Sequence, residues 1–194
     1  MTSSSPLSLW LRGQPSLVGT PPALSIDSLP DDPVGLFSEW IMDAAERGVA
    51  EPQATTLATV DARGVPDSRT LILKDVTERG WAFAGPRSSA KGVQLAQSPA
   101  AALNFWWQPI RRAVRVRGSV REATSAESDA DLAARSATAR AGIRPGDWVR
   151  WWLEPTTVEF WQGAADRRHI RIIYASDGER WVRSLVNVET DERS

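Results

Sequence analysis

Glycine-containing turns recur along this chain, and each one separates two short segments rich in β-branched and aromatic residues. The turns read Asp61-Ala-Arg-Gly64, Thr77-Glu-Arg-Gly80 and Asp177-Gly178, a composition typical of β-hairpins. Strands joined by hairpins pair antiparallel, and many such strands in one domain favour a barrel. The expected strands cover residues 55–60, 68–74, 81–84, 102–107, 114–121, 148–153, 157–162, 168–174 and 180–185. The sequence therefore predicts a mainly β fold built on an antiparallel, barrel-like sheet.

Three helices are expected to flank this sheet. The first can be capped by Asp32, has Pro33 in its first turn and ends at Gly48. Its apolar side chains repeat on one side, so the helix should face the core. The other two are expected over residues 89–97 and 125–141, and only a partial capping signal, at Ser125, starts the last one.

The composition of the two terminal segments predicts the domain boundaries. Residues 1–28 are rich in proline and serine and show no sustained hydrophobic period, which predicts a flexible N-terminal arm. One domain is expected over residues 29–188, followed by a polar tail over residues 189–194.

Composition excludes several kinds of chemistry. The chain has no cysteine and a single histidine, His169, which rules out disulfides, thiolate chemistry and multi-histidine metal sites, so no metal is expected. The formal net charge is −1, which argues against a nucleic-acid or membrane-surface partner. No apolar run reaches transmembrane length, and no dinucleotide or P-loop glycine motif is present. These features predict a soluble, cytoplasmic protein.

The densest polar cluster lies near the C-terminus. Arg167, His169 and Arg171 are spaced by two residues, so on a strand they would share one face. Two arginines and an imidazole on one face suit an anionic ligand, and the imidazole can also move a proton. An exposed basic strand edge that prevents aggregation has the same pattern, and both interpretations stay open.

Lysine is rare in this chain. Only Lys74 and Lys91 occur among the 23 basic residues. Lys91 follows Ser88 and Ser89 at the start of a predicted helix, where hydroxyls and free backbone N–H groups can hold a phosphate. Each lysine taken alone is equally consistent with a solvated surface charge.

Several ordered motifs resemble the pyridoxine/pyridoxamine 5′-phosphate oxidase family over residues 29–185. The most specific is Glu159-Phe-Trp-Gln-Gly163 followed by Arg167-Arg-His169-Ile-Arg171. The others are Leu29-Pro-Asp-Asp-Pro33, Leu36-Phe37, Trp40, Ala54 to Asp61, Gly64, Pro66, Arg69, Leu71-Ile-Leu-Lys74, Ser89-Ala-Lys91-Gly92, Phe105-Trp106-Trp107 and Val114-Arg-Val-Arg-Gly118.

This resemblance implies a fold, a cofactor and a reaction. The fold is an FMN-binding split β-barrel with flanking helices, and the assembly is a homodimer with FMN at the subunit interface. The reaction is a hydride transfer from a small phosphorylated or aromatic-acid substrate to FMN, with O₂ as the acceptor that gives H₂O₂.

The resemblance also assigns site residues by position. The assigned residues are Arg69 and Lys91 for the FMN phosphate, Trp161 and Arg171 for further FMN contacts, Lys74 and Arg135 for the substrate phosphate, and Arg167 and His169 as catalytic residues over the substrate ring.

The chain departs from the family at several of these places. Ala90 replaces a basic residue, Ala113 a glutamine, Asp131 a tyrosine and Ala139 a serine, and a segment is missing before Pro145. A carboxylate at Asp131 should repel a substrate phosphate. Two alternatives therefore remain: a flavin oxidase of secondary metabolism, of the phenazine type, and a non-catalytic FMN-binding protein.

Overall fold

A computed structural model describes residues 5–187. The helices in this part are α1 (Pro6–Arg12), α2 (Pro33–Glu46), α3 (Ala90–Gln97), the short 3-10 helix η1 (Gln108–Ile110), α4 (Ser125–Ala133) and α5 (Ala137–Arg140). The strands are β1 (Ala54–Val60), β2 (Pro66–Ile72), β3 (Asp75–Thr77), β4 (Gly80–Pro86), β5 (Ala100–Trp107), β6 (Arg112–Glu122), β7 (Trp148–Gln162), β8 (Ile170–Ser176) and β9 (Trp181–Asn187).

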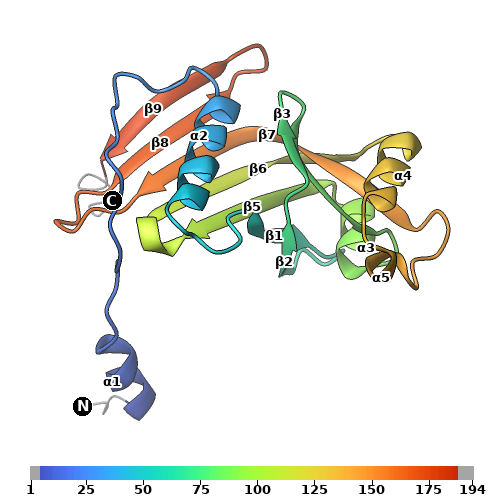
Figure 1. The fold of residues 1–194 in the computed structure, drawn as a ribbon, viewed down its shortest axis with the longest axis horizontal. Helices are drawn as coiled ribbons and strands as arrows, with labels where there is room; N and C mark the ends of the chain where they lie inside the picture. Colours follow the sequence, from blue (N-terminus) through green and yellow to red (C-terminus); the bar gives the residue numbers. More distant parts are fainter. Residues whose placement is uncertain (1–4, 188–194) are drawn as a thin grey trace.

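The predicted mainly β, antiparallel fold is confirmed. All strand pairs are antiparallel, in the order β2-β1-β5-β6-β7-β4-β3, and β8 and β9 extend the sheet beyond β7. The chain passes directly from β2 to β3, and the junction bonds to both neighbours. Leu73 N donates to Gln53 O at 3.0 Å, and Lys74 N donates to Ala82 O at 2.8 Å. This junction closes the sheet into a barrel (Figure 1).

The long strand β7 is where the sheet divides. β7 pairs with β6 along most of its length, with β4 over Trp148–Leu153 and with β8 over Thr157–Gln162. The register of β6 shifts between Arg117 and Gly118, and a side chain at Gly118 would collide with the Glu154 carbonyl. The bulge needs glycine for this close approach. On the two sides of this bulge β7 has different partners: β4 as far as Leu153, and β8, which pairs with β9, from Thr157 onward.

Helix α2 covers the aromatic core. Its N-cap Asp32 accepts hydrogen bonds from Val34 N and Gly35 N, both at 2.9 Å, as predicted. The fully buried Phe37 ring packs edge-on against Trp81 and Phe105, with centroids 5.5 and 5.0 Å apart. Aromatic pairs of this geometry add to the stabilisation from burial alone.

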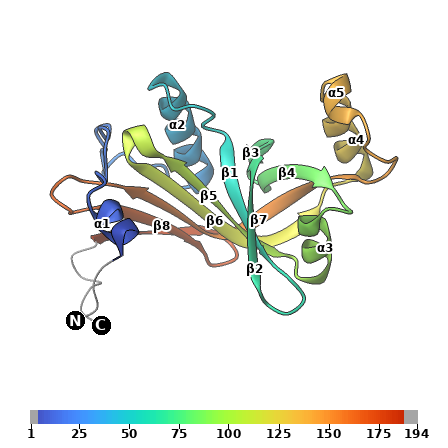
Figure 2. The ribbon, with the colours of Figure 1, turned by 90° about the horizontal axis from the view of Figure 1, so that it is seen from below.

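The face of the sheet that points away from α2 is exposed over β5–β8. Trp106, Ala113, Trp161 and Arg171 are consecutive partners across four strands, so they share one face. Trp106 is 48% exposed on this open sheet face. Figure 2 shows α2 on one side of these strands.

Four local predictions were wrong. The two strands expected over 148–153 and 157–162 are one strand, because β7 continues through the division. The helix expected over 125–141 is two helices, because Ser136 caps a second one. The cap of the first is Thr124 rather than Ser125, in a complete capping box with Glu127. The strand expected from residue 168 begins at Ile170.

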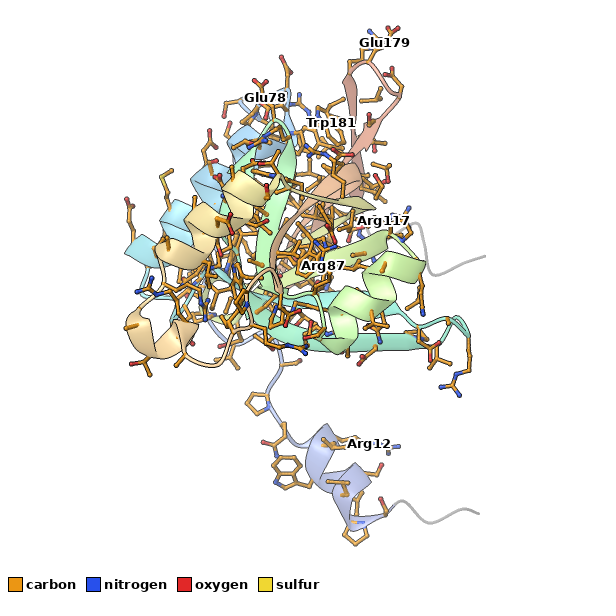
Figure 3. The ribbon with its side chains drawn as sticks, turned by 90° about the vertical axis from the view of Figure 1, so that its right-hand side faces the viewer. Arg12, Glu78, Arg87, Arg117, Glu179 and Trp181 are labelled. Carbon is orange, nitrogen blue, oxygen red and sulfur yellow. The ribbon has the colours of Figure 1, made fainter. Side chains whose placement is uncertain are left out.

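The N-terminal residues include one helix. α1 has no buried residue, and Leu7, Leu9, Trp10 and Leu11 are 57–64% exposed. Figure 3 shows Arg12 of α1 far from the rest of the molecule. None of the described helices is long and apolar enough to cross a membrane. The tail predicted over 189–194 lies outside the described residues.

Candidate functional site

Lys91 and Arg69, the two predicted FMN phosphate ligands, lie close to each other at the start of α3. Ser89 caps α3, and Lys91 Nζ donates to its hydroxyl at 3.1 Å. The Lys91 side chain lies against Gly85, where any Cβ would collide with Nζ. Burial, and next the charge of Arg69, lower the pKa of Lys91. Among the described residues, Lys91 has no carboxylate within ion-pairing distance.

Arg69 is held in place by side chains that local sequence patterns do not link to it. Its guanidinium donates to Thr59 Oγ1, to Gln94 Oε1 at 3.0 Å and to Asp67 Oδ2 at 2.6 Å. Sequence reasoning missed these supports, although Asp67 and Arg69 stand two apart on one strand and so share a face. We call Arg69, Ser89 and Lys91 the α3 basic cluster. A helix N-terminus beside an uncompensated cation is suited to an anion such as a phosphate.

Lys74 and Arg135, the predicted substrate-phosphate ligands, lie in a different environment. Lys74 Nζ is 3.5 Å from Asp131 Oδ1, and Trp148 Nε1 donates to Asp131 Oδ2 at 2.8 Å. The Arg135 guanidinium lies 4.5 Å from the centre of the Trp148 ring. We call these four residues the α4 ion-pair cluster. The predicted neighbours do come together, and Asp131 neutralises Lys74.

The shared strand face predicted for Arg167, His169 and Arg171 was wrong. The first two lie in the β7–β8 loop, which turns back on itself: Arg167 N donates to Ala164 O at 3.2 Å, and His169 N donates to Arg167 O at 2.9 Å. Arg167 has a positive φ of 63°. Because the loop is a turn, strand alternation does not apply to it. Arg171 alone is on β8, where it pairs with Glu159 at 3.4 Å.

His169 still has a defined neighbourhood. Its Nδ1 accepts a hydrogen bond from Ala164 N at 3.0 Å, and its ring centroid is 4.9 Å from that of Trp161. Arg167 and His169 line a hollow of about 310 Å³ together with Arg111 and with Leu17 of the N-terminal segment. Sequence reasoning missed Arg111 and Leu17, for which it offered no signal.

The eight predicted site residues therefore form groups at opposite ends of one chain. Arg69, Lys91, Lys74 and Arg135 belong to the end that carries α3, α4 and α5, while the β7–β8 loop is at the other end (Figure 1). Trp151, beside Lys91, and Trp161, beside His169, are ten positions apart on β7. At strand rise this is roughly 30 Å. A single chain does not bring the two ends together.

Comparison with known proteins gives matches along most of the chain. The family model "Pyridoxamine 5′-phosphate oxidase" matches residues 41–162, and "Pyridoxine 5′-phosphate oxidase C-terminal dimerisation region" matches residues 148–187. The pyridoxine/pyridoxamine 5′-phosphate oxidase of Thermosynechococcus vestitus is 36% identical over 184 residues, covering 79% of this chain and 87% of the relative. The protein of that name from Ectopseudomonas mendocina is 38% identical over 194 residues, covering 82% of this chain and 90% of the relative.

Solved structures show the same fold. PhzG from Burkholderia lata 383, in complex with tetrahydrophenazine-1-carboxylic acid, superposes with a TM-score of 0.80 and 25% identity, covering 87% of this chain and 100% of that one. A pyridoxamine 5′-phosphate oxidase-related, FMN-binding protein from Nostoc punctiforme has a TM-score of 0.69 at 22% identity, covering 82% and 98%. The second likeness concerns the fold alone.

Proposed function

The chain belongs to the pyridoxamine 5′-phosphate oxidase family and is a flavin-dependent oxidoreductase, and we propose that its flavin is FMN, bound through its phosphate at the α3 basic cluster. The observation that carries this proposal is Lys91, a partly buried cation with a lowered pKa and, among the described residues, no carboxylate partner. A phosphate dianion would supply the missing counter-charge. The α3 N-terminus would add backbone N–H donors, while Arg69, whose guanidinium already pairs with Asp67 at 2.6 Å, would contribute less than Lys91.

Two glycines allow the close packing around the cluster. Gly92 lies so close to the Arg87 carbonyl that no side chain is possible there, and Gly85 leaves room for Lys91. The missing basic side chain at Ala90 reduces the grip to one lysine and one arginine. FMN should therefore bind by fewer phosphate contacts than in relatives that keep a basic residue at this position.

We further propose that two subunits complete the site. The homodimer is supported by the dimerisation-region match over residues 148–187, which includes the open sheet face residues Trp161 and Arg171. Placing the β7–β8 end of one subunit beside the α3 end of the other would join the two groups that one chain keeps apart. Trp161 and Arg171 would then contact FMN, as the family resemblance implies.

When bound, FMN supplies a two-electron acceptor for a hydride from the substrate, and we propose that O₂ takes the electrons on. The protein's own contribution is positioning. Because His169 Nδ1 accepts from Ala164 N, the proton of a neutral His169 ring lies on Nε2. Nε2 can donate to a substrate atom, and packing against Trp161 fixes the ring plane. Arg167 beside it can bind a negative group on the substrate.

Two substrate classes are consistent with this site. Pyridoxine or pyridoxamine 5′-phosphate follows from the names of the relatives, and an aromatic acid follows from the ligand of the PhzG structure.

A spectrum and an oxidase assay test the proposal. The purified full-length protein should show flavin absorbance, release FMN on denaturation, and form H₂O₂ with one of the two substrate classes. Bound flavin without H₂O₂ from either class would mean that the substrate or the electron acceptor is another one. A colourless protein that FMN cannot reconstitute would contradict the proposal.

A further inference from the structure

The Asp131 carboxylate already forms an ion pair with Lys74, the lysine predicted to bind a substrate phosphate. The carboxylate lies 3.5 Å from Lys74 Nζ, and both side chains are largely removed from water, with exposed fractions of 9% for Asp131 and 22% for Lys74. Ion pairs in such partly desolvated positions are screened less than surface pairs. Lys74 is therefore not an open anion site.

The carboxylate is also fixed in place. Its second oxygen accepts the Trp148 indole hydrogen bond at 2.8 Å, and the Trp148 ring is only 8% exposed. Arg135 stacks on the same ring. Helix α4, which carries Asp131, is capped by the Thr124–Glu127 box. Moving the carboxylate aside for a ligand would break the indole hydrogen bond inside a packed cluster.

Most charged groups around Lys74 are already paired, so this region can balance little additional negative charge. Asp75, next to Lys74, pairs with Arg150 at 2.7 Å, so that pair also sums to zero. The cation left over is Arg135, whose buried Nε has no hydrogen-bond partner within the described part of the chain. One unpaired guanidinium suits a carboxylate. A phosphate dianion would meet the Asp131 carboxylate at close range.

We propose that Asp131 is a specificity-determining residue that excludes phosphorylated substrates, so that the substrate is a non-phosphorylated ring compound with at most one negative charge. This inference rests on the proposed function and on the position that the resemblance implies for the substrate, beside Lys74 and Arg135. It assigns the aromatic-acid class over the vitamin phosphates.

Two ligands that differ only by a phosphate test it: pyridoxine and pyridoxine 5′-phosphate, titrated by calorimetry into the full-length protein with and without FMN. The variant is Asp131→Asn, which removes the charge and keeps an oxygen for the Trp148 indole. The matched control is Asp129→Asn, an exposed residue on the same helix that loses the same charge.

The wild-type protein should bind pyridoxine 5′-phosphate less than about threefold more tightly than pyridoxine. In Asp131→Asn the phosphate form should gain at least tenfold, while pyridoxine stays within twofold and Asp129→Asn behaves as wild type. If wild type binds neither compound, a gain of phosphate binding in Asp131→Asn alone still supports the proposal.

A wild-type protein that binds pyridoxine 5′-phosphate at least tenfold more tightly than pyridoxine would overturn the proposal. So would an equal ratio of the two affinities in Asp131→Asn and Asp129→Asn. Failure to bind FMN is a separate result that counts against the proposed function only, because the ligand ratio is also measured without flavin.

Discussion

The two lysines of this chain occupy opposite electrostatic environments. Lys91 is partly buried beside a hydroxyl and a second cation, while Lys74 is partly buried against the Asp131 carboxylate. A desolvated cation without a counter-ion raises the free energy of the ligand-free protein, and a bound anion recovers that cost. A cation that is already paired has less to gain from a ligand. The same residue type is thus proposed to mark a binding site in one place and a closed site in the other.

The largest expected effect concerns FMN affinity. Lys91→Met should weaken FMN binding by about 10- to 100-fold, because a charge-assisted bond to phosphate contributes roughly 1.5–3 kcal/mol. Lys74→Met should change it less than about threefold. Fluorescence titration with FMN and with riboflavin measures both, and riboflavin, which lacks the phosphate, should not distinguish Lys91→Met from wild type.

Arg87→Met is the control for net charge. Arg87 lies close to α3 (Figure 3) and already pairs with Glu122 at 2.8 Å. Its loss should leave FMN affinity within about twofold. If Arg87→Met weakens FMN as much as Lys91→Met does, the comparison between paired and unpaired cations fails.

The second effect is on the stability of the flavin-free protein, where the two lysines should differ in sign. Lys74→Met leaves the partly buried Asp131 carboxylate without its lysine partner. The free energy of unfolding should fall by about 1–2 kcal/mol, between the values for surface and buried ion pairs. Lys91→Met removes an uncompensated charge and should be neutral or stabilising. Urea unfolding at neutral pH measures both variants, and equal destabilisation would remove the distinction drawn between the two environments.

Local patterns predicted most of the fold. The turns at 61–64, 77–80 and 177–178 join β1 to β2, β3 to β4 and β8 to β9. Helix α2 begins at its predicted cap, Asp32, and ends at Glu46, two residues before the predicted Gly48. These features depend on residues close in sequence. The undivided strand β7 was missed because its continuity follows from pairing with β6, a partner distant in the chain, across an irregularity that leaves Thr156 of β7 unpaired.

The candidate site was harder to predict for the same reason. The family resemblance assigned positions 69, 74, 91 and 135 to phosphate binding, and their roles remain predictions. Asp131 was expected only to repel phosphate. Its pairing with Lys74 and its hydrogen bond from Trp148 are contacts over long sequence separations, which no periodicity reveals. The Arg167–His169 error arose because strand spacing was extended into a turn.

A smaller effect should follow from loosening the helix that holds Asp131. Thr124→Ala removes the N-cap of α4 and should destabilise the protein by about 1 kcal/mol. Because α4 positions the Lys74 partner and not the Lys91 site, amide hydrogen exchange should accelerate in α4 while α3 stays protected. FMN affinity should not change. Faster exchange in both helices would show that the two sites are not independent.

The smallest effect is a pH dependence confined to Lys91. In the flavin-free folded protein the pKa of Lys91 lies below its ordinary value of 10.5, because of burial and then Arg69. Between that lowered pKa and 10.5 the unfolded chain holds more protons on this residue, so its contribution to stability rises with pH. A bound phosphate favours the charged lysine, so FMN binding takes up a proton in the same window. FMN affinity should therefore fall as pH rises toward 10.5, and this fall should be absent in Lys91→Met. Titrations at about pH 8 to 10 with both proteins measure it; parallel curves would mean that Lys91 does not face the phosphate.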